Sequence, residues 1–232
     1  GEVLAFIDAD CVPDRGWLAS AQQALAKRPD AVLGGRVSIA PKDEKSLTPI
    51  EAYEMEYGFR MDRYIRKQGF TGAGNLVVAR PFFEHVGGFG GIEVAEDVDW
   101  CRRARAKGLD IVYIDDMVVF HPARESHDQV NEKWDRQIAH EYNAVGGFWG
   151  RIAFLCKALL LPLSPVWEVF RIAFSDRLIG VQTKSLALVA LTRIRVHRSR
   201  KMLDVFLYSG AARVFPQWNR SESDEGSGSP RE

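Results

Sequence analysis

Two aspartates, Asp8 and Asp10, follow the continuously apolar stretch Val3–Ile7 and are separated by one residue. An unbroken apolar run of this length predicts a strand that is buried on both faces. In an open α/β sheet, ligands bind beyond the carboxyl ends of the strands, which is where this pair lies. Two carboxylates so close together repel each other unless a cation neutralises them, and Mg²⁺ or Mn²⁺ prefers such oxygen ligands. The pair is therefore a candidate metal site, and the structural alternative is a turn in which the aspartates cap backbone amides.

A second acidic pair, Glu96 and Asp97, lies at the start of a helix predicted over Glu96–Lys107. Acidic residues at the start of a helix and basic residues at its end complement the helix dipole, which accounts for Asp99 and the four basic residues after it. A carboxylate that is fixed at a helix end and faces a cleft can also accept a proton from an attacking hydroxyl. Asp97 is therefore a candidate general base.

The third candidate is His121, which follows the predicted strand Ile111–Phe120 at its carboxyl end, where Pro122 is expected to stop the strand. If this strand and Val3–Ile7 are parallel neighbours, His121 opens onto the same crevice as Asp10. Imidazole is a good ligand for Mn²⁺ beside carboxylates. His121 is thus a candidate metal ligand, although a lone histidine beside a loop is more often a surface residue.

The elements that must position these residues alternate between strand and helix. This alternation predicts an α/β sheet flanked by helices over residues 1–128. From residue 129 to 210 nearly all of the chain is expected to be helical, and the Gly/Ser-rich residues 211–232 are expected to be a disordered tail. Further strands are expected at 31–39 and 76–79, and helices at 15–28 (capped by Asp14), 49–66 and 81–86.

The composition excludes several classes of protein. The 232 residues are 46% hydrophobic, enough for a sizeable core, and 31 Lys and Arg balance 31 Asp and Glu. A net charge of zero argues against a nucleic-acid partner. The three cysteines lie far apart, which fits neither a disulfide framework nor a zinc knuckle and indicates a reducing compartment.

The stretch Phe148–Phe174 is long enough to span a bilayer, but charged residues and two prolines interrupt it. A pair of helices that lie in the membrane interface suits this composition better, while a full span and simple packing on the sheet stay as alternatives. The basic stretch Arg193–Lys201 is expected to be attracted to an anionic membrane surface. We therefore predict a membrane-interface region at the cytoplasmic face of a membrane.

Four stretches, in this order and spacing, resemble those of a known family: "LAFIDADCVP", "GAGNLVVARPFFEHVGGF", "AEDVDWCRRARAKG" and "IVYIDDMVVFHPARES". Over residues 1–127 the chain resembles the C-terminal two-thirds of a family 2 glycosyltransferase of the GT-A fold. The resemblance implies that the first strand–helix units of the core, which bind the nucleotide, are missing and that the chain is truncated at its N-terminus. We therefore expect weak or no nucleotide binding by the chain as it stands.

The resemblance also implies a reaction, which is inverting transfer of a sugar from a nucleotide diphosphate, most often UDP, to a hydroxyl of a lipid or glycan. It implies Mg²⁺ or Mn²⁺ as cofactor, and the absence of a QxxRW motif favours transfer of one sugar, or a few, over polymer synthesis. Trp100 and Trp134 are candidate platforms for a sugar ring. The implied roles are Asp10 and His121 as metal ligands, Asp8 touching the metal or the donor ribose, Asp97 as the base with Glu96 orienting groups beside it, and Gly72, Gly74 and Asn75 lining the donor sugar.

Two rival functions remain open from the sequence. A phosphatase of the haloacid dehalogenase type also places a DxD pair at a strand end and would use Asp8 and Asp10. That class gives no reason for the Glu96–Asp97 pair or for His121. The other rival is a catalytically inert, membrane-associated scaffold that keeps the fold.

Overall fold

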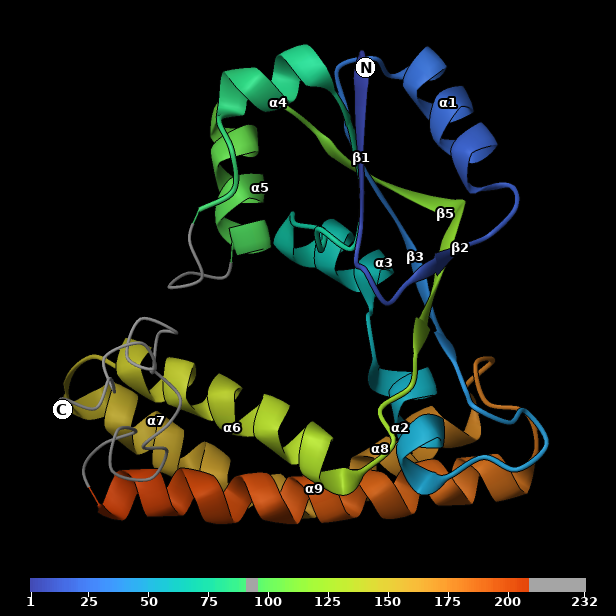
Figure 1. Ribbon diagram of the computed structural model, residues 1–232. Helices are drawn as coiled ribbons and strands as arrows, with labels where there is room; N and C mark the ends of the chain where they lie inside the picture. The colour runs from blue at the N-terminus through green and yellow to red at the C-terminus, as the bar shows by residue number, and fades with distance from the viewer. Residues whose placement is uncertain (91–95, 209–232) are drawn as a thin grey trace, which may run out of the picture. The chain divides into compact units, whose positions relative to one another are not determined.

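The computed structural model describes residues 1–90 and 96–208, so the predicted tail at 211–232 lies outside the described residues. The chain forms two compact units, one from residues 1–47 and 57–123 and the other from 48–56 and the chain from 124 onward (Figure 1). The chain thus leaves the first unit at residue 48, returns at 57 and leaves again at 124. The sequence predicted a single crossing near residue 128.

The first unit contains a five-stranded mixed sheet with helices packed on it, which confirms the predicted α/β class. Two central strands run parallel, and the other neighbouring pairs are antiparallel. In spatial order the strands are β1 (Val3–Ile7), β4 (Asn75–Ala79), β3 (Val32–Ala40), β5 (Ile111–Pro122) and β2 (Val12–Pro13).

Strand β1 differs from its prediction in two ways. It is not buried on both faces, because within the described sheet it pairs only with β4 and its first residue, Val3, is 46% exposed. Leu4 and Phe6 pack against the core, while the alternate residues Val3 and Ala5 are exposed. Nor is β1 a neighbour of β5, since β4 and β3 lie between them. It nevertheless runs in the same direction as β5, so the carboxyl ends of both strands lie at the same edge.

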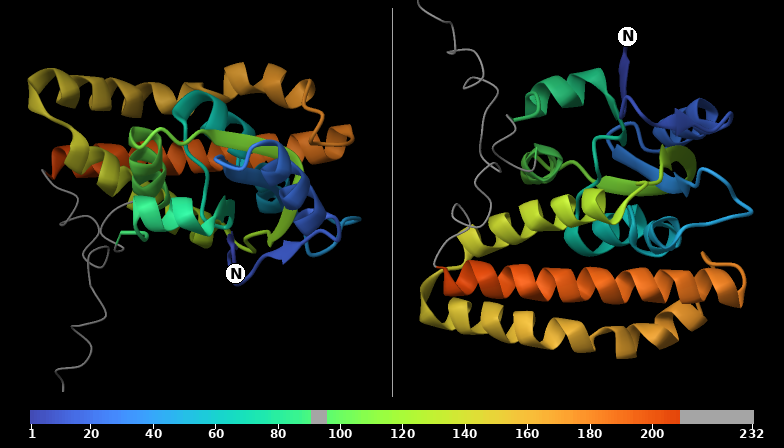
Figure 2. Two further views of the ribbon diagram at one scale, coloured as in Figure 1. Left: turned by 90° about the horizontal axis from the view of Figure 1, so that it is seen from above. Right: turned by 60° about the horizontal axis from the view of Figure 1, so that its bottom comes forward.

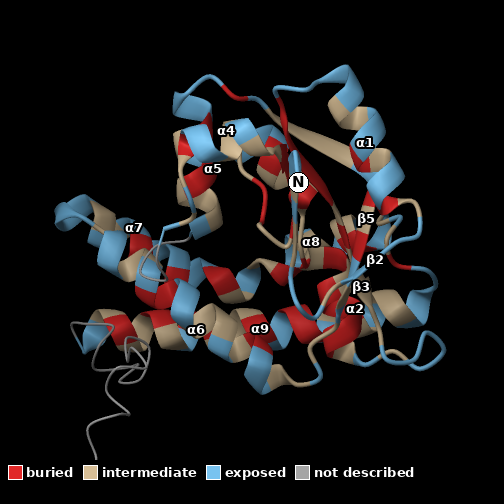
Figure 3. Cartoon of the chain, turned by 45° about the horizontal axis from the view of Figure 1, so that its top comes forward, coloured by how far each residue is buried: buried red, intermediate tan, exposed pale blue. Residues whose placement is uncertain are grey.

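Helices cover both faces of the sheet (Figures 1 and 2). On one face, Trp17 of α1 (Trp17–Lys27) packs with Leu33 and Val77. On the other face, α4 (Arg80–Val86) and α5 (Glu96–Ala106) pack against the alternate strand residues, among them Leu76. Figure 3 shows that buried residues concentrate along the central strands. Because successive side chains of a strand point to opposite faces of the sheet, the same strands contribute to two separate cores.

Helix α1 begins at Trp17 rather than at Arg15. The Asp14 carboxylate accepts a hydrogen bond from the Gly16 amide at 3.0 Å, so it forms the turn before the helix and does not cap the helix itself. Short aspartate side chains often form this kind of local turn.

The helix predicted over 49–66 is broken. It divides into α2 (Pro49–Tyr57), a single turn α3 (Met61–Arg63) and the π-helical turn η1 (Tyr64–Gln68). At the break, Phe59 has φ +41°, the one positive φ of a non-glycine residue among those the structure describes. A left-handed residue cannot continue a right-handed helix, so the chain turns here and passes from one unit to the other.

The β3–β5 ladder is interrupted near the carboxyl edge of the sheet. Gly35 is paired with Ile114, but the next residue, Arg36, is paired with Val118. The side chain of Asn75, which is 1% exposed, occupies the interruption and donates to the Arg36 carbonyl at 2.9 Å and to the Met117 carbonyl at 2.8 Å.

The same Asn75 amide also accepts a hydrogen bond from the Trp17 indole at 2.9 Å, so it links three strands to α1. A side chain on Gly35 would not fit beside it, because a Cβ there would lie 2.3 Å from Asn75 Nδ2 and 2.1 Å from the Met117 oxygen. The interruption therefore depends on an amide at 75 and a glycine at 35.

The second unit is helical. Its long helix α9 (Val181–Leu207) packs against α6 (His127–Ala144), α7 (Gly147–Leu160) and α8 (Pro165–Ala173), as Figure 2 shows. A short 3-10 turn, η2 (Leu161–Leu163), joins α7 to α8.

The basic stretch in α9 is not the exposed patch that the sequence suggested. Arg193 and Arg200 are exposed, but Arg198 is 6% exposed and Arg195 is largely covered. A helix that packs on three others turns part of any such stretch inward.

Replacing Asn75 by Ala should destabilise the chain by about 2–4 kcal/mol, because it leaves one buried donor and two buried acceptors unpaired. Urea unfolding followed by circular dichroism measures the change. Asn143→Ala, at an exposed position of α6, is the control and should shift stability by no more than about 0.5 kcal/mol. Equal stability of the Asn75 variant and the parent would contradict the role assigned to this amide.

Candidate active site

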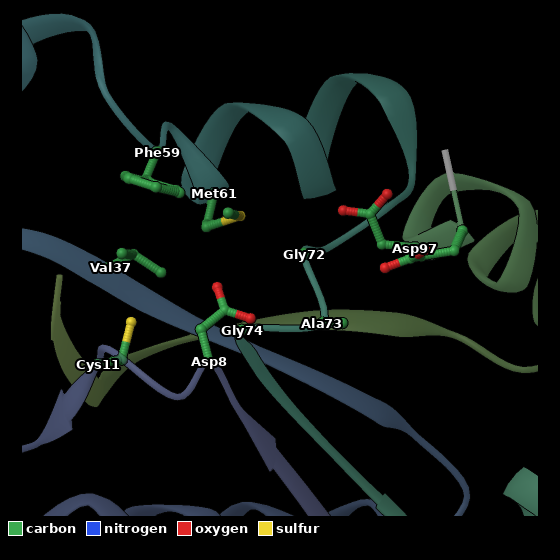
Figure 4. Close-up of a pocket in the computed structure, with 10 residues that line it drawn as sticks. Asp8, Cys11, Val37, Phe59, Met61, Gly72, Ala73, Gly74 and Asp97 are labelled. Carbon is green, nitrogen blue, oxygen red and sulfur yellow. The ribbon is translucent and has the colours of Figure 1, made fainter. Parts of the chain in front are cut away.

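A pocket of about 330 Å³ opens at the carboxyl edge of the sheet within the first unit (Figure 4). Asp8 and Cys11 reach it from the turn after β1, Asp97 from the start of α5, and Phe59 and Met61 from the segment opposite. Residues from three widely separated stretches therefore meet in one cavity. Of the residues singled out from the sequence, Asp8, Gly72, Gly74, Glu96 and Asp97 line it.

Gly74 permits the close approach of Asp8. A Cβ on Gly74 would lie 2.2 Å from Asp8 Oδ2, far inside contact distance. Gly72 is less crowded, since its Cβ would lie 3.0 Å from the Met61 methyl carbon and 3.7 Å from an Asp97 oxygen. The glycine-rich segment before β4 thus leaves room for the Asp8 carboxylate. Beside Asp97 it presents backbone without a side chain.

Asp97 is electrostatically unusual. Its pKa is raised above the ordinary aspartate value, mainly by burial and further by the negative charge of Asp8, while hydrogen bonds from backbone amides oppose the shift. One of those bonds comes from the Val98 amide to Asp97 Oδ1 at 2.7 Å. A carboxylate with a raised pKa is a stronger base, and it lies on a helix that holds it in place.

Beside the pocket, Asp10, Cys11 and His121 form a group whose possible ligand atoms lie within 4.8 Å of one another. The short strand β2 explains this convergence. Val12 pairs with Phe120, so the turn that follows Asp8 is drawn to the end of β5. The predicted meeting of Asp10 and His121 therefore occurs through β2, and not through a β1–β5 pairing.

The donor set fits a divalent cation. His121 Nδ1 lies 2.6 Å from the Pro122 carbonyl oxygen, which can only accept, so Nδ1 carries a hydrogen. In the neutral ring, Nε2 is then an acceptor, and it faces Asp10 Oδ2 at 3.5 Å. Two acceptors that face each other at this distance suit a cation between them, and a backbone carbonyl commonly orients a metal-binding histidine in this way.

Cys11 contributes a thiol rather than a thiolate to this group in the absence of a cation. Burial, and then the charges of Asp8 and Asp10, raise its pKa to about 11. A protonated thiol is a poor metal ligand. The oxygen and nitrogen donors of Asp10 and His121 are therefore the better ligands, which favours Mg²⁺ or Mn²⁺.

Three residues singled out from the sequence belong neither to the pocket nor to the group beside it. Trp134 belongs to the helical unit. Asn75, which the resemblance assigned to the donor sugar, does not line the pocket, because its amide is used inside the sheet. Trp100 is fully buried, donates to the Gly87 carbonyl at 2.8 Å and packs with Phe83, so it offers no platform for a sugar.

Phe59 is a pocket residue that no sequence motif indicates. It lines the pocket, and its ring lies 4.6 Å from the His121 ring between centroids. Its positive φ is the signal that marks it, because a strained backbone costs on the order of 1–3 kcal/mol and often occurs at functional sites. Only the folded structure provides that signal.

Comparison with known proteins agrees with this site. The family model described as "Glycosyl transferase family 2" matches residues 1–86. The chain is similar to glycosyltransferase AglE of Haloferax volcanii, with 30% identity over 125 residues, which is 53% of this chain and 40% of that protein. It is also similar to the probable glucomannan 4-beta-mannosyltransferase 9 of Oryza sativa subsp. japonica, with 27% identity over 124 residues, or 51% of this chain and 23% of that protein.

The chain spans less than half the length of either relative. The family match covers Asp8, Gly72 and Gly74 of the pocket. These matches give no support to the phosphatase. The resemblance seen in the sequence is confirmed by the family 2 model, which matches residues 1–86 of this chain.

Proposed function

We propose that the pocket transfers a sugar, without processive synthesis, from a nucleotide-diphosphate donor, in the first place a UDP-sugar, to a hydroxyl acceptor, and that the sheet unit is a GT-A core. The observation that carries the proposal is the meeting of Asp8, Glu96 and Asp97 in one cavity beside the Asp10–His121 pair. The family 2 match supports transferase chemistry over hydrolysis of phosphomonoesters or an inert scaffold.

In the proposed reaction Asp97 is the base. The acceptor oxygen forms a bond to the anomeric carbon, the bond from that carbon to the diphosphate breaks with its electron pair, and the hydroxyl proton goes to Asp97. A single displacement inverts the anomeric centre. Glu96, exposed at the pocket rim, orients the acceptor, and Asp8 contacts the donor where Gly74 leaves it room.

Asp10 and His121 are the proposed ligands of a divalent cation, Mg²⁺ or Mn²⁺. When bound, the cation stabilises negative charge on the diphosphate as a Lewis acid. The ring of Phe59 lies against His121 and keeps the imidazole directed at Asp10. The acceptor is proposed to be a lipid or a glycan.

Asp97→Asn should lower the rate of UDP release from UDP-sugars in the presence of acceptor by at least 100-fold, because an amide cannot take the proton. A base must be deprotonated, and the pKa of Asp97 is raised, so the acid limb of the parent's pH–rate profile should lie above the ordinary aspartate pKa of about 3.9. Asp116→Asn, at an exposed position on β5, is the control and should retain full activity.

Folding of the Asp97 variant is checked independently. Because burial raises the pKa of this group in the folded state, the carboxylate destabilises the fold at neutral pH, and that cost disappears as the pH falls through its pKa. Asp97→Asn should therefore be at least as stable as the parent at pH 7. A stable Asp97→Asn variant with full activity would refute Asp97 as the base.

Mn²⁺ should bind the chain with one site detectable by electron paramagnetic resonance, and His121→Gln or Asp10→Asn should weaken it at least tenfold. His85→Gln, at an exposed position of α4, should leave the affinity unchanged. Cys11→Ser should also leave it unchanged if the thiol stays protonated. If the parent and His121→Gln bind Mn²⁺ with equal affinity, His121 is not a ligand of the cation.

We further propose that the helical unit lies on a membrane surface, with the chain at the cytoplasmic face. Among residues 1–90 and 96–208 no single helix is long and apolar enough to cross a bilayer, although the bent pair formed by α7 with η2 and α8 passes the criterion together, with a bend of 55°. Large side chains on this pair are exposed, with Trp149 78% and Trp167 79% exposed. Tryptophan at an exposed apolar face suits the headgroup region.

Replacing both Trp149 and Trp167 by Ser should lower binding to phosphatidylcholine–phosphatidylglycerol vesicles at least tenfold, because each indole buries apolar area worth about 1.5–3 kcal/mol. Co-sedimentation measures the bound fraction. Leu18→Ser removes a comparably exposed apolar side chain of α1, 63% exposed, and should have no effect. If the parent protein stays in the supernatant, the proposal that the helical unit lies on a membrane surface is contradicted.

A further inference from the structure

In the helical unit, α6 and α9 bring together three side chains that no step of the proposed transfer uses. The guanidinium carbon of Arg198 lies 3.7 Å from the centroid of the Trp134 ring. Arg195, one turn earlier on α9, lies on the same side of the helix. Tyr53 of α2, 7% exposed, is close enough to interact with both guanidinium groups and with the indole. We call these four residues the Trp134 cluster.

The cluster holds three buried N–H donors. Arg195 Nε and Arg198 Nε have no hydrogen-bond partner in the described part of the chain, and the indole of Trp134 interacts with the Tyr53 hydroxyl. Nearly all buried polar groups in folded proteins are paired, and each unpaired one costs about 1–3 kcal/mol. Both unpaired atoms are N–H donors, so what they lack is an acceptor.

Two neighbouring guanidinium groups favour an acceptor that is negative. Burial and the neighbouring Arg195 lower the pKa of Arg198 to about 10.

The nearby carboxylates are already engaged. Glu54 accepts hydrogen bonds from the backbone amide and the guanidinium of Arg124. Glu141 pairs with a lysine of α7. Glu168 is shared between Arg171 at 3.5 Å and Arg195 at 3.8 Å. None of these contacts supplies an acceptor to the Nε–H groups of Arg195 and Arg198.

We propose that the Trp134 cluster binds an oxyanion of the phosphate class. A guanidinium fork matches phosphate oxygens, and four such oxygens can accept from several donors at once. The Tyr53 hydroxyl stays protonated at neutral pH, because burial raises its pKa, and it can donate as well. Arg195, whose side chain is 19% exposed, gives access from solvent. The phosphate group belongs either to a free phosphate compound or to the headgroup of a phosphate-bearing lipid.

Isothermal titration of the whole chain with inorganic phosphate and with pyrophosphate, against chloride at equal ionic strength, tests the site. Saturable binding is expected for at least one of the two. Arg198→Gln and Arg195→Gln should each weaken it at least tenfold. Trp134→Phe keeps the stacked ring and removes only the Nε1 hydrogen, so a severalfold loss is expected. Arg200→Gln, exposed on the same helix, is the matched control and should bind like the parent.

A second arm distinguishes the two sources of phosphate. Phosphatidylcholine vesicles with added phosphatidic acid, a phosphomonoester lipid, are compared with vesicles that carry the same charge as phosphatidylglycerol. A preference for phosphatidic acid that Arg198→Gln abolishes assigns the site to a lipid headgroup, whereas binding of soluble phosphate without that preference assigns it to a free compound.

If Arg198→Gln fails to fold by circular dichroism, Arg195→Gln and Trp134→Phe carry the test. Absence of saturable phosphate or pyrophosphate binding together with equal binding to both kinds of vesicle would overturn the proposal. So would binding that the cluster variants and Arg200→Gln change to the same extent.

Discussion

The amide of Asn75 holds the edge of the sheet on which the candidate site is built. Beyond Gly35 the β3–β5 ladder loses its register, and two carbonyls and an indole would otherwise be left unpaired in the core. With these groups satisfied, β5 resumes its pairing with β3 and reaches His121 in a fixed position. Short β2 pairs with that same end of β5, and the turn bearing Asp10 precedes it directly. The approach of an aspartate to a histidine thus depends on one buried side chain that contacts neither.

The pocket is strongly acidic, and this limits which ligands it can take. Asp8, Glu96 and Asp97 line it and Asp10 lies beside it. A diphosphate would be repelled by so many carboxylates unless a cation came with it, so cation binding and donor binding are coupled in the proposed function. The same acidity suits the proposed base, because the burial of Asp97 and the charge of Asp8 together keep the affinity of Asp97 for a proton high. In the proposed function, one set of carboxylates therefore both attracts the cation and strengthens the base.

Local sequence patterns predicted most of the strands and helices, and motif order predicted the family. What they missed is set by contacts between distant residues. A strand of two residues such as Val12–Pro13 has no periodicity to detect, so the convergence of Asp10 and His121 was expected for a wrong reason, a β1–β5 pairing. The break at Phe59 has no proline to indicate it, and the contact of its ring with His121 exists only in the folded chain. The family resemblance assigned Asn75 to the donor sugar, but only the interrupted ladder shows why an amide is needed there.

For the basic stretch of α9, by contrast, the spacing of the residues along the sequence does indicate which side chains are buried. Buried positions of α9 recur at intervals of three and four residues, from Leu191 through Ile194, Arg198 and Met202 to Val205. Arg198 therefore lies on the apolar stripe of the helix and not on its exposed face. A guanidinium on such a stripe requires something in the interior to stabilise it, and here the stacked face of Trp134 provides only part of that stabilisation. The unpaired Nε–H of Arg198 is one of the observations on which the proposed anion site rests.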